Sequence, residues 1–454
     1  MFMKNKTSIH TIIYLTLGYF LFTSTMSMLN RDIAGNVEGR HMFLYMLQSF
    51  SLVIGLLLYP FFRQTLGLSY KTSRKILVLT GTIYIIGILS VGYITDYAYI
   101  VTLMILLPIT MGYSQGMIYV HLVRDMYDER HMGRIFSSAL GIAIFLQFIL
   151  QIKLNIGTAL PVLMCCIYIF LIIWEFGVSD EIKEIKDPAV NVKPDCLRDR
   201  GFLRISAIAI CLIILANYLD GQMELLLDTS YFFSWARLFY SVGFIAMGLL
   251  WDMKNKRIAS TVMVTAAILS ILMPAFLMNK SFWMFDICFF YFYLGFCVIY
   301  NSLRFMSYAR SHGDIYPAVA YRFFDNFITG LLVLVGFSGI SFLSAFIVDT
   351  ILLAVTVFLI FRDCTADTRS ASDISKETIT DVERLSAFVA KYKLTDRESE
   401  VCELLITKDE KGEDMAKELG VSRRGFVSLA SAVYKKTETG SRIALLQKYM
   451  SDNL

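Results

Sequence analysis

The chain has 454 residues, of which 56 % are hydrophobic and only 18 % charged, with a formal net charge of +4. Soluble proteins carry about a quarter charged residues, so this composition excludes a wholly soluble protein, a disordered chain and a disulfide-rich secreted domain. The mean hydropathy of +0.59 favours a protein that lies largely in a lipid bilayer. The eight cysteines form no paired CxxC motif, so we expect no zinc site and no redox motif. The sequence predicts no other metal or cofactor.

Twelve long apolar runs follow one another along the chain. A helix that crosses a bilayer needs about 20 mostly apolar residues, and the runs of that kind lie at 10–29, 41–62, 76–94, 97–118, 135–152, 156–176, 202–219, 231–251, 258–278, 282–300, 318–338 and 342–361. A charged loop, 177–201, separates the first six runs (1–176) from the last six (202–361). The sequence therefore predicts an all-α protein with a twelve-span membrane domain over 1–361. No small-residue cleavage site follows the first run, so we expect a first span there and not a removed signal peptide.

Lysine and arginine are concentrated on one side of the predicted membrane domain. The loops on the side of the N-terminus, with their helix edges, contain 21 Lys and Arg residues, and the opposite loops contain four. Cytoplasmic loops of membrane proteins carry such an excess. We therefore expect both termini to be cytoplasmic.

The chain becomes polar after the last apolar run. Residues 362–389 have the composition of a linker, and 390–454 alternate short amphipathic patterns with turn signals. Thr395 and Glu398 match a capping box that opens a helix. Gly420 fits the left-handed residue that ends a helix, and Ser422 fits the cap of the next one.

These signals predict four short helices, with a helix-turn-helix from about Gly412 to Ser431. The second half of this domain, 419–454, carries six basic and two acidic residues, whereas 384–418 carry seven basic and nine acidic. A positive face on a helix-turn-helix is typical of DNA binding, although a protein-binding helical bundle also fits. The candidate DNA contacts are Arg423, Arg424, Ser428, Lys435, Lys436 and Arg442.

Several motifs of this domain belong to a known pattern. The opening L-T-x-R-E-x-E-V-x-x-L-L is matched from Leu394 to Leu405, and the later matches are Met415, Ala416, Leu419, Val421, Ser422, Val433, Tyr434, Lys435, Lys436, Ser441 and Arg442. In these residues the segment resembles the LuxR-type helix-turn-helix domain of bacterial transcription regulators. Where that family has T-V-K-x-H, this chain has Gly425, Phe426, Val427 and Leu429. The resemblance implies double-stranded DNA as a partner, a homodimer on DNA and a bacterial cell membrane.

The membrane domain carries a second pattern, weaker in the first half. Gly248, Leu250, Asp252, Lys254, Lys256 and Arg257 follow G-x-L-x-D-R-x-G-R-R, whereas the first half has Arg63, Arg74 and Lys75 without an aspartate. With its six-plus-six spans, this part resembles the major facilitator superfamily. The resemblance implies two six-helix bundles around a central cavity.

Ionisable residues inside predicted spans are candidates for a ligand site because they are costly to insert. Arg237 lies about two turns into the predicted span 231–251, and Asp349 lies near the middle of the last span. Arg322 and Asp325, spaced i, i+3, can neutralise one another. We expect Arg237, with Asp325 and Asp349, to bind an anionic ligand, or alternatively to form an internal pair that holds the halves together.

No catalytic constellation is present, so we expect no enzymatic activity. The sequence favours a membrane-embedded one-component transcription regulator in which a bundle senses a small molecule and controls a DNA-binding tail. The alternatives are a transporter with a regulatory tail and a protein whose degenerate tail no longer binds DNA.

Overall fold

A computed structural model describes most of the chain, and all regular structure in the described residues is helical, as the sequence predicts. The described residues are 2–30, 41–91, 96–125, 131–154, 159–177, 196–226, 235–253, 256–277, 283–335, 347–362, 385–407 and 412–451. The chain divides into two compact units, Met1–Asp363 and Cys364–Leu454. The linker between the predicted domains, apart from its two ends, lies outside the described residues.

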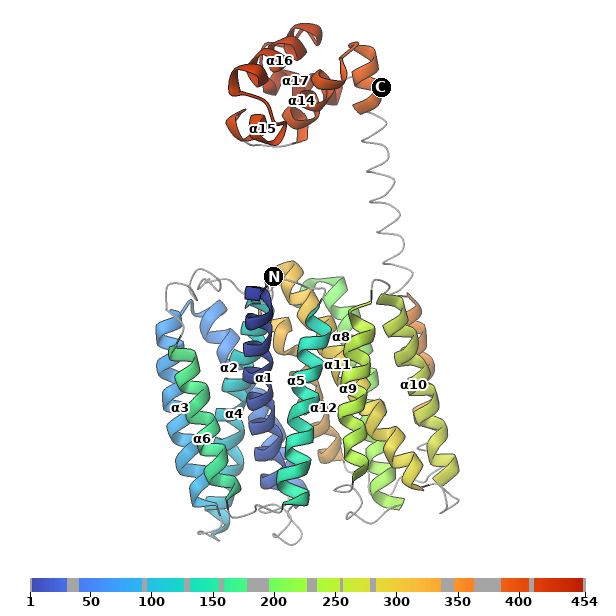
Figure 1. The fold of residues 1–454 in the computed structure, drawn as a ribbon. Helices are drawn as coiled ribbons and strands as arrows, with labels where there is room; N and C mark the ends of the chain where they lie inside the picture. The colour runs from blue at the N-terminus through green and yellow to red at the C-terminus, as the bar shows by residue number, and fades with distance from the viewer. Residues whose placement is uncertain are drawn as a thin grey trace. The chain divides into compact units, whose positions relative to one another are not determined.

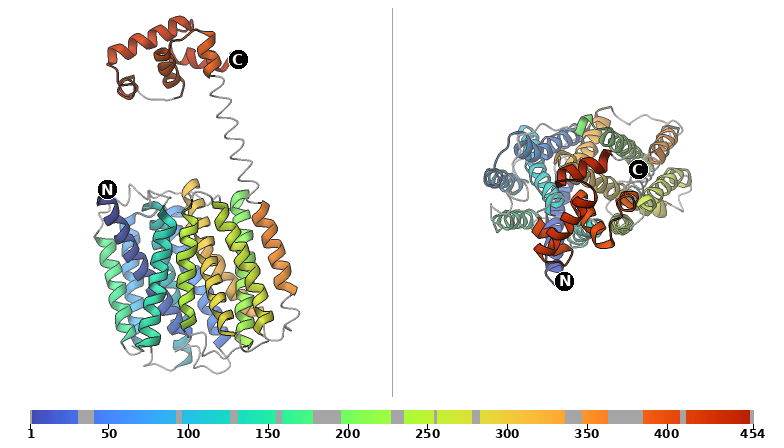
Figure 2. Two further views of the ribbon diagram at one scale, coloured as in Figure 1. Left: turned by 45° about the vertical axis from the view of Figure 1, so that its right-hand side comes forward. Right: turned by 90° about the horizontal axis from the view of Figure 1, so that it is seen from above.

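The first unit is a bundle of helices that run side by side (Figures 1 and 2). Its first half contains α1 (Phe2–Met28), α2 (His41–Pro60), α3 (Tyr70–Ser90), α4 (Tyr97–Asp125), α5 (Met132–Gln147) and α6 (Leu160–Phe176). Its second half contains α8 (Arg200–Leu226), α9 (Leu238–Trp251), α10 (Lys256–Leu277), α11 (Trp283–His312), α12 (Tyr316–Val335) and a helix over 347–362.

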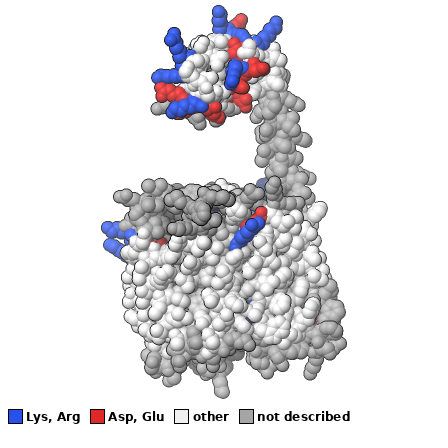
Figure 3. All heavy atoms as spheres, in the orientation of Figure 1, with Lys and Arg blue, Asp and Glu red and all other residues white. Residues whose placement is uncertain are grey.

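Seven helices in the described part of the chain are long and apolar enough to cross a membrane. Three further stretches, Leu160–Phe176, Trp235–Trp251 and Ile258–Ser270, are apolar but shorter. The described residues of every predicted apolar run are helical, except for the turn residues Val91 and Ala159 at the ends of two helices. Figure 3 shows that the described side of this unit carries few charged residues between its two ends. These features are those of a multi-pass membrane protein, and the full count of twelve spans is part of the proposal made for this chain.

The two halves of the bundle are packed alike. Within each half the second helix packs on the fourth (α2 on α4, α9 on α11), and so does the third (α3 on α4, α10 on α11). Between the halves, α2 packs on α12 and α5 packs on α9. The second helix of each half thus meets the fifth helix of the other, as two-fold related repeats would.

The helices extend beyond the apolar runs because polar turns are capped or bonded at their ends. The helix α3 begins at Tyr70, six residues before its predicted apolar run, since the Ser69 side chain accepts a hydrogen bond from the Thr72 N–H. The helix α9, in contrast, begins after the start of its predicted apolar run. It begins at Leu238 and follows a short 3-10 turn, Trp235–Arg237. Arg237 therefore lies in the turn that leads into α9, and the first four residues of the predicted run, 231–234, lie outside the described residues.

The second unit contains a helix over 385–391 and the four helices α14 (Asp396–Thr407), α15 (Gly412–Glu418), α16 (Arg423–Lys436) and α17 (Arg442–Ser451). Its core is apolar and comprises Phe388, Leu394, Val401, Cys402, Leu404, Leu405, Met415, Ala416, Phe426, Ala430, Val433 and Leu445. Phe388 is fully buried, with its ring centroid 5.3 Å from that of Tyr449. The folded unit therefore begins before residue 390, the first residue of the predicted domain.

Local signals in the sequence explain the turns of this unit. Glu398 accepts a hydrogen bond from the Thr395 N–H at 2.8 Å, which is one half of the predicted capping box. Gly420 has φ +67° after α15, and the Ser422 hydroxyl accepts a hydrogen bond from the Gly425 N–H at 3.1 Å at the start of α16. Gly425 thus lies in the first turn of α16, where it weakens the helix less than in the middle.

Candidate nucleic-acid interface and ligand pocket

The helix α16 buries one face and exposes the other. Phe426, Ala430 and Val433 lie in the core, and Leu429 packs against it. The opposite face is an exposed stripe of residues that recur at helical spacing. The stripe consists of Arg424, Val427, Ser428, Ser431 and Lys435. At 1.5 Å per residue this exposed stripe is about 16 Å long. It offers two cations near its ends with hydroxyls and one apolar side chain between them.

Three of the six predicted DNA contacts, Arg424, Ser428 and Lys435, belong to this exposed stripe. Arg423 is also exposed, but its guanidinium lies 2.6 Å from a carboxylate oxygen of Glu413 in α15. A cation that is already paired has less charge to offer a phosphate.

The other two predicted contacts, Lys436 and Arg442, bond inside the domain. The Lys436 ammonium lies 2.5 Å from the Glu398 carboxylate and donates to the Lys393 carbonyl at 3.1 Å. Arg442 Nε donates to the Leu405 carbonyl at 2.8 Å. These two residues therefore tie α16 and α17 to α14, at opposite ends of that helix.

The pKa values of Glu398 and Cys402 agree with structural roles for both residues in this domain. The Lys436 ammonium, and secondly the Thr395 N–H, hold the pKa of Glu398 below its usual value, so this carboxyl is ionised at neutral pH. Burial raises the pKa of the Cys402 thiol to about 12. Cys402 is therefore a neutral core residue and not a reactive thiol.

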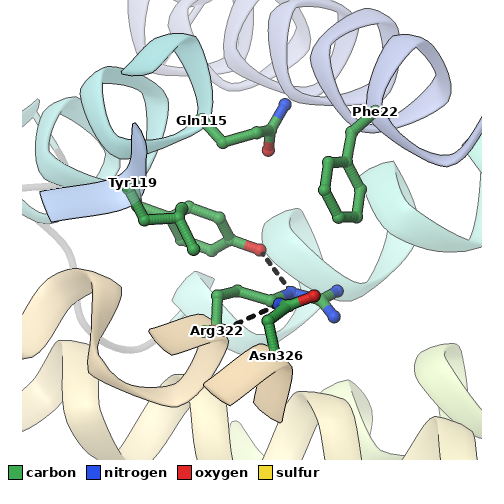
Figure 4. Close-up of a pocket in the computed structure, with 6 residues that line it drawn as sticks. Phe22, Gln115, Tyr119, Arg322 and Asn326 are labelled. Carbon is green, nitrogen blue, oxygen red and sulfur yellow. Dashed lines mark hydrogen bonds between the residues drawn. The ribbon is translucent and has the colours of Figure 1, made fainter. Parts of the chain in front are cut away.

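The membrane unit holds a small pocket between its two halves (Figure 4). Its lining residues are Phe22 of α1, Leu56 of α2, Gln115 and Tyr119 of α4, and Arg322 and Asn326 of α12. The free volume inside the pocket is about 10 Å³, about enough for one water molecule and far below the ~300–1,000 Å³ of sites for drug-sized ligands. A ligand therefore needs a more open arrangement of the two halves than this one.

Arg322 is the charged residue of this pocket, and its side chain is 8 % exposed. The guanidinium donates to the Tyr19 hydroxyl at 2.8 Å, to the Tyr119 hydroxyl at 3.2 Å and to Asp325 at 3.1 Å. The carbon at its centre also lies 5.4 Å from the centroid of the Tyr19 ring. Because a guanidinium has five N–H groups, two of them are left over beyond these three bonds.

The predicted ligand residues are therefore placed differently from the expectation. Asp325 lies beside Arg322, which the sequence suggested only as its neutralising partner. Arg237 is half-buried at the start of α9, within electrostatic reach of Tyr291. Asp349 is buried in the helix over 347–362, within reach of Tyr218 and Tyr293. The buried cation of the pocket is thus Arg322, and its contacts with Tyr19 and Tyr119 were not predicted from the sequence.

Comparison with known proteins adds no identification. No family model matches the chain, and no curated protein matches it.

Proposed function

We propose that this chain is a membrane-embedded one-component transcription regulator. A facilitator-like bundle of twelve spans binds a small molecule and controls a cytoplasmic DNA-binding domain of LuxR type. The main support is the exposed stripe of α16, which combines Arg424 and Lys435 with the hydroxyls of Ser428 and Ser431. Cations bind phosphates, and hydroxyls bind phosphates or base edges.

Val427 is the one apolar side chain of this stripe. It is 55 % exposed at the centre of the face, at a position where the LuxR-type pattern has another residue. An apolar side chain there contacts the methyl group of thymine in the major groove. We therefore expect a recognition sequence with thymine opposite the centre of α16. Two tails, in a homodimer, read half-sites about 34–36 Å apart.

The bundle supplies the regulatory part of the proposal. The pocket is lined by α1, α2 and α4 of the first half and by α12 of the second half. A ligand that contacts both halves prefers one of their arrangements and shifts the population toward it. We propose that an oxygen of the ligand's anionic group accepts from the Arg322 N–H groups that are left over beside Tyr19, Tyr119 and Asp325, and that this group competes with Asp325 for the guanidinium. The proposed location is a bacterial cell membrane, with both termini in the cytoplasm.

Genome-wide capture of DNA with the intact protein tests the DNA-binding function. We expect discrete sites for the wild-type chain and loss of these sites for Arg424→Ala combined with Lys435→Ala. The matched control is Lys391→Ala combined with Arg397→Ala, which removes the same charge from exposed residues outside α16. Sites that are absent in the wild type, or unchanged in the α16 variant, would contradict the proposal.

A transporter is the second candidate because the two halves are packed alike, as in carriers with repeated halves. Its discriminating test is substrate flux in sealed vesicles. Robust flux by a chain that ends at residue 362, together with no DNA sites for the intact chain, would favour the transporter.

A further inference from the structure

A buried carboxylate lies near the end of α6 and is not among the residues that line the pocket. Glu175 is 3 % exposed and accepts hydrogen bonds from the hydroxyls of Tyr14 in α1 and Tyr70 in α3. Its Oε1 also lies 3.3 Å from Nδ1 of His121 in α4. A carboxylate in such a place is stable only with several donors around it. Three donors from three other helices meet that need.

The imidazole of His121 joins this carboxylate to a further helix. Its side chain is 5 % exposed, and its Nε2 lies 2.9 Å from the hydroxyl of Tyr59 in α2. Because Nδ1 faces an acceptor, Nδ1 carries the hydrogen in the neutral ring, and Nε2 accepts from the Tyr59 O–H. The ring is thus fixed at both nitrogens.

Other charged and titratable groups lie close by. The Arg74 guanidinium in α3 donates to the backbone carbonyl of Glu175 at 3.0 Å and lies over the rings of Tyr70 and Phe176. Tyr113 of α4 donates to the Ser73 carbonyl, and Arg63, just after α2, donates to the Leu68 carbonyl. Tyr113 also packs its ring 5.8 Å from that of Tyr59 and interacts electrostatically with Glu175 and Arg63. In the described part of the chain, the groups that surround His121 and Glu175 are therefore Tyr14, Tyr59, Arg63, Tyr70, Arg74 and Tyr113.

We propose that His121 and Glu175 form a proton-binding site in the first half of the bundle. The incoming proton adds to the lone pair of His121 Nε2 and makes an imidazolium, which stays bonded to Glu175 through Nδ1–H. Nε2–H then donates to the Tyr59 oxygen, which requires the Tyr59 O–H to turn away from the ring. One proton is taken up, the charge of the site rises by one, and no covalent bond between heavy atoms changes.

The position of the site gives proton binding a structural consequence. Its residues come from α1, α2, α3, α4 and α6, so five of the six helices of the first half share one hydrogen-bond network. Reversal of the Tyr59–His121 bond changes how α2 is held against α4, and α2 also packs on α12 of the other half. If this network were purely structural, position 121 would need only one donor and one acceptor, and a side-chain amide would supply both. An imidazole also changes its charge between about pH 5 and 8, and this property suits a proton-binding site.

The test uses the full chain in lipid nanodiscs with ¹⁵N-labelled histidine rings. The chain has five histidines. The His121 signals are those that disappear in His121→Gln. The same signals should shift in Tyr59→Phe, a variant that keeps all five imidazole rings. We expect the Nε2 signal to move from the unprotonated to the protonated range between about pH 8 and pH 5. Glu175→Gln removes the counter-charge that holds the imidazolium, so the change of the Nε2 signal should be lost or incomplete at pH 5.

A second measurement follows the thermal unfolding midpoint of the full chain across the same pH range. The pH dependence should become smaller in His121→Gln and stay as in the wild type in His10→Gln, the control at an exposed histidine. A His121 signal that does not move between about pH 5 and 8, or equal pH profiles for His121→Gln and the wild type, would overturn the proposal. Neither readout involves DNA, so this outcome is separate from that of the regulator proposal.

Discussion

The carboxylate of Asp252 accepts a hydrogen bond from the backbone N–H of Gly133 at 2.8 Å. Its second oxygen accepts from the N–H of Arg134 at 2.9 Å. Asp252 ends α9, and the two N–H groups belong to the first turn of α5 in the other half. First-turn N–H groups have no partner within their own helix and favour a negative charge. This one side chain therefore closes the α5–α9 crossing.

Replacement of Asp252 by alanine should lower the thermal unfolding midpoint of the full chain in nanodiscs. The N–H of the buried residue Gly133 loses its partner, and a buried unsatisfied donor costs about 1–3 kcal/mol, whereas the exposed N–H of Arg134 can bond to water instead. Asp96→Ala is the comparison, because Asp96 also accepts an N–H, from Tyr99, but it does so within one exposed helix start. An equal loss in both variants would show that Asp252 has no special role between the halves.

The equivalent crossing of α2 and α12 shows a limit of sequence reading. There the Gln64 side chain accepts a hydrogen bond from the Ile315 N–H at 2.9 Å, just before α12. The first half carries no aspartate in its motif, so by sequence it matches the superfamily pattern less closely than the second half does. At this crossing the carboxamide oxygen of Gln64 accepts an N–H at the start of α12, as Asp252 does at the start of α5. Only the three-dimensional arrangement reveals that Gln64 and Asp252 occupy corresponding places.

Glycines allow the same close approach in both halves. A Cβ at Gly112 in α4 would lie 2.7 Å from the backbone of Gly55 in α2, and a Cβ at Gly295 in α11 would lie 2.6 Å from the Tyr240 carbonyl in α9. We expect Gly112→Ala and Gly295→Ala each to destabilise the bundle by roughly 1–3 kcal/mol, since backbone cannot move aside easily.

Thermal unfolding of these glycine variants in nanodiscs measures the effect. Gly141→Ala is the control, because a Cβ there meets mainly the flexible side chain of Ile245 at 3.2 Å. A loss of stability in Gly141→Ala as large as in the other two would argue against the close backbone contact. Gly112 and Gly116 form a GxxxG pattern, which favours close approach of helices, whereas Gly295 has no glycine four residues away.

Arg322 and Asp325 should show strong energetic coupling. Arg322→Leu leaves Asp325 without its ion-pair partner and should destabilise the chain by roughly 3 kcal/mol, whereas Arg322→Leu with Asp325→Asn should recover part of that loss. Thermal unfolding in nanodiscs measures both. Arg237→Leu is the control outside the pocket and should have a smaller effect. Additive losses from Arg322→Leu and Asp325→Asn would contradict the pairing.

The ligand pocket and the proton-binding site could not be found from the sequence for a common reason. Arg322 contacts Tyr19 and Tyr119, which are 303 and 203 residues away along the chain. Glu175 and His121 are 54 residues apart and lie on different helices. Hydropathy reveals where helices run but not which polar side chains meet between them. The caps at Ser422 and Gly420 were predictable because capping involves residues close in sequence.

The Glu398–Lys436 contact should make the tail sensitive to acid. Because the folded state holds the pKa of Glu398 below its unfolded value, this contact stabilises the domain fully above the unfolded pKa of about 4.3. The stabilisation is lost as the pH falls through the folded pKa. Hydrogen-exchange protection factors of α14 and α16 in the intact chain should fall with acid in the wild type and much less in Glu398→Gln. Glu400→Gln, at a carboxyl 47 % exposed, should behave as the wild type does.

The neighbouring lysines 435 and 436 should separate DNA binding from folding. Lys435 is exposed at the end of the α16 stripe, so Lys435→Ala should weaken DNA binding and reduce the slope of log affinity against log salt by about 1, with unchanged protection in the tail. Lys436→Ala removes the partner of Glu398 and the bond to the Lys393 carbonyl, so it should lower protection in α14 and α16 by roughly 1 kcal/mol or less. Titration of captured DNA fragments at several salt concentrations measures the first effect, and hydrogen exchange measures the second. If Lys435→Ala lowered protection and Lys436→Ala alone reduced the salt slope, the two side chains would have the opposite roles, and the exposed stripe would not be the surface that binds phosphate.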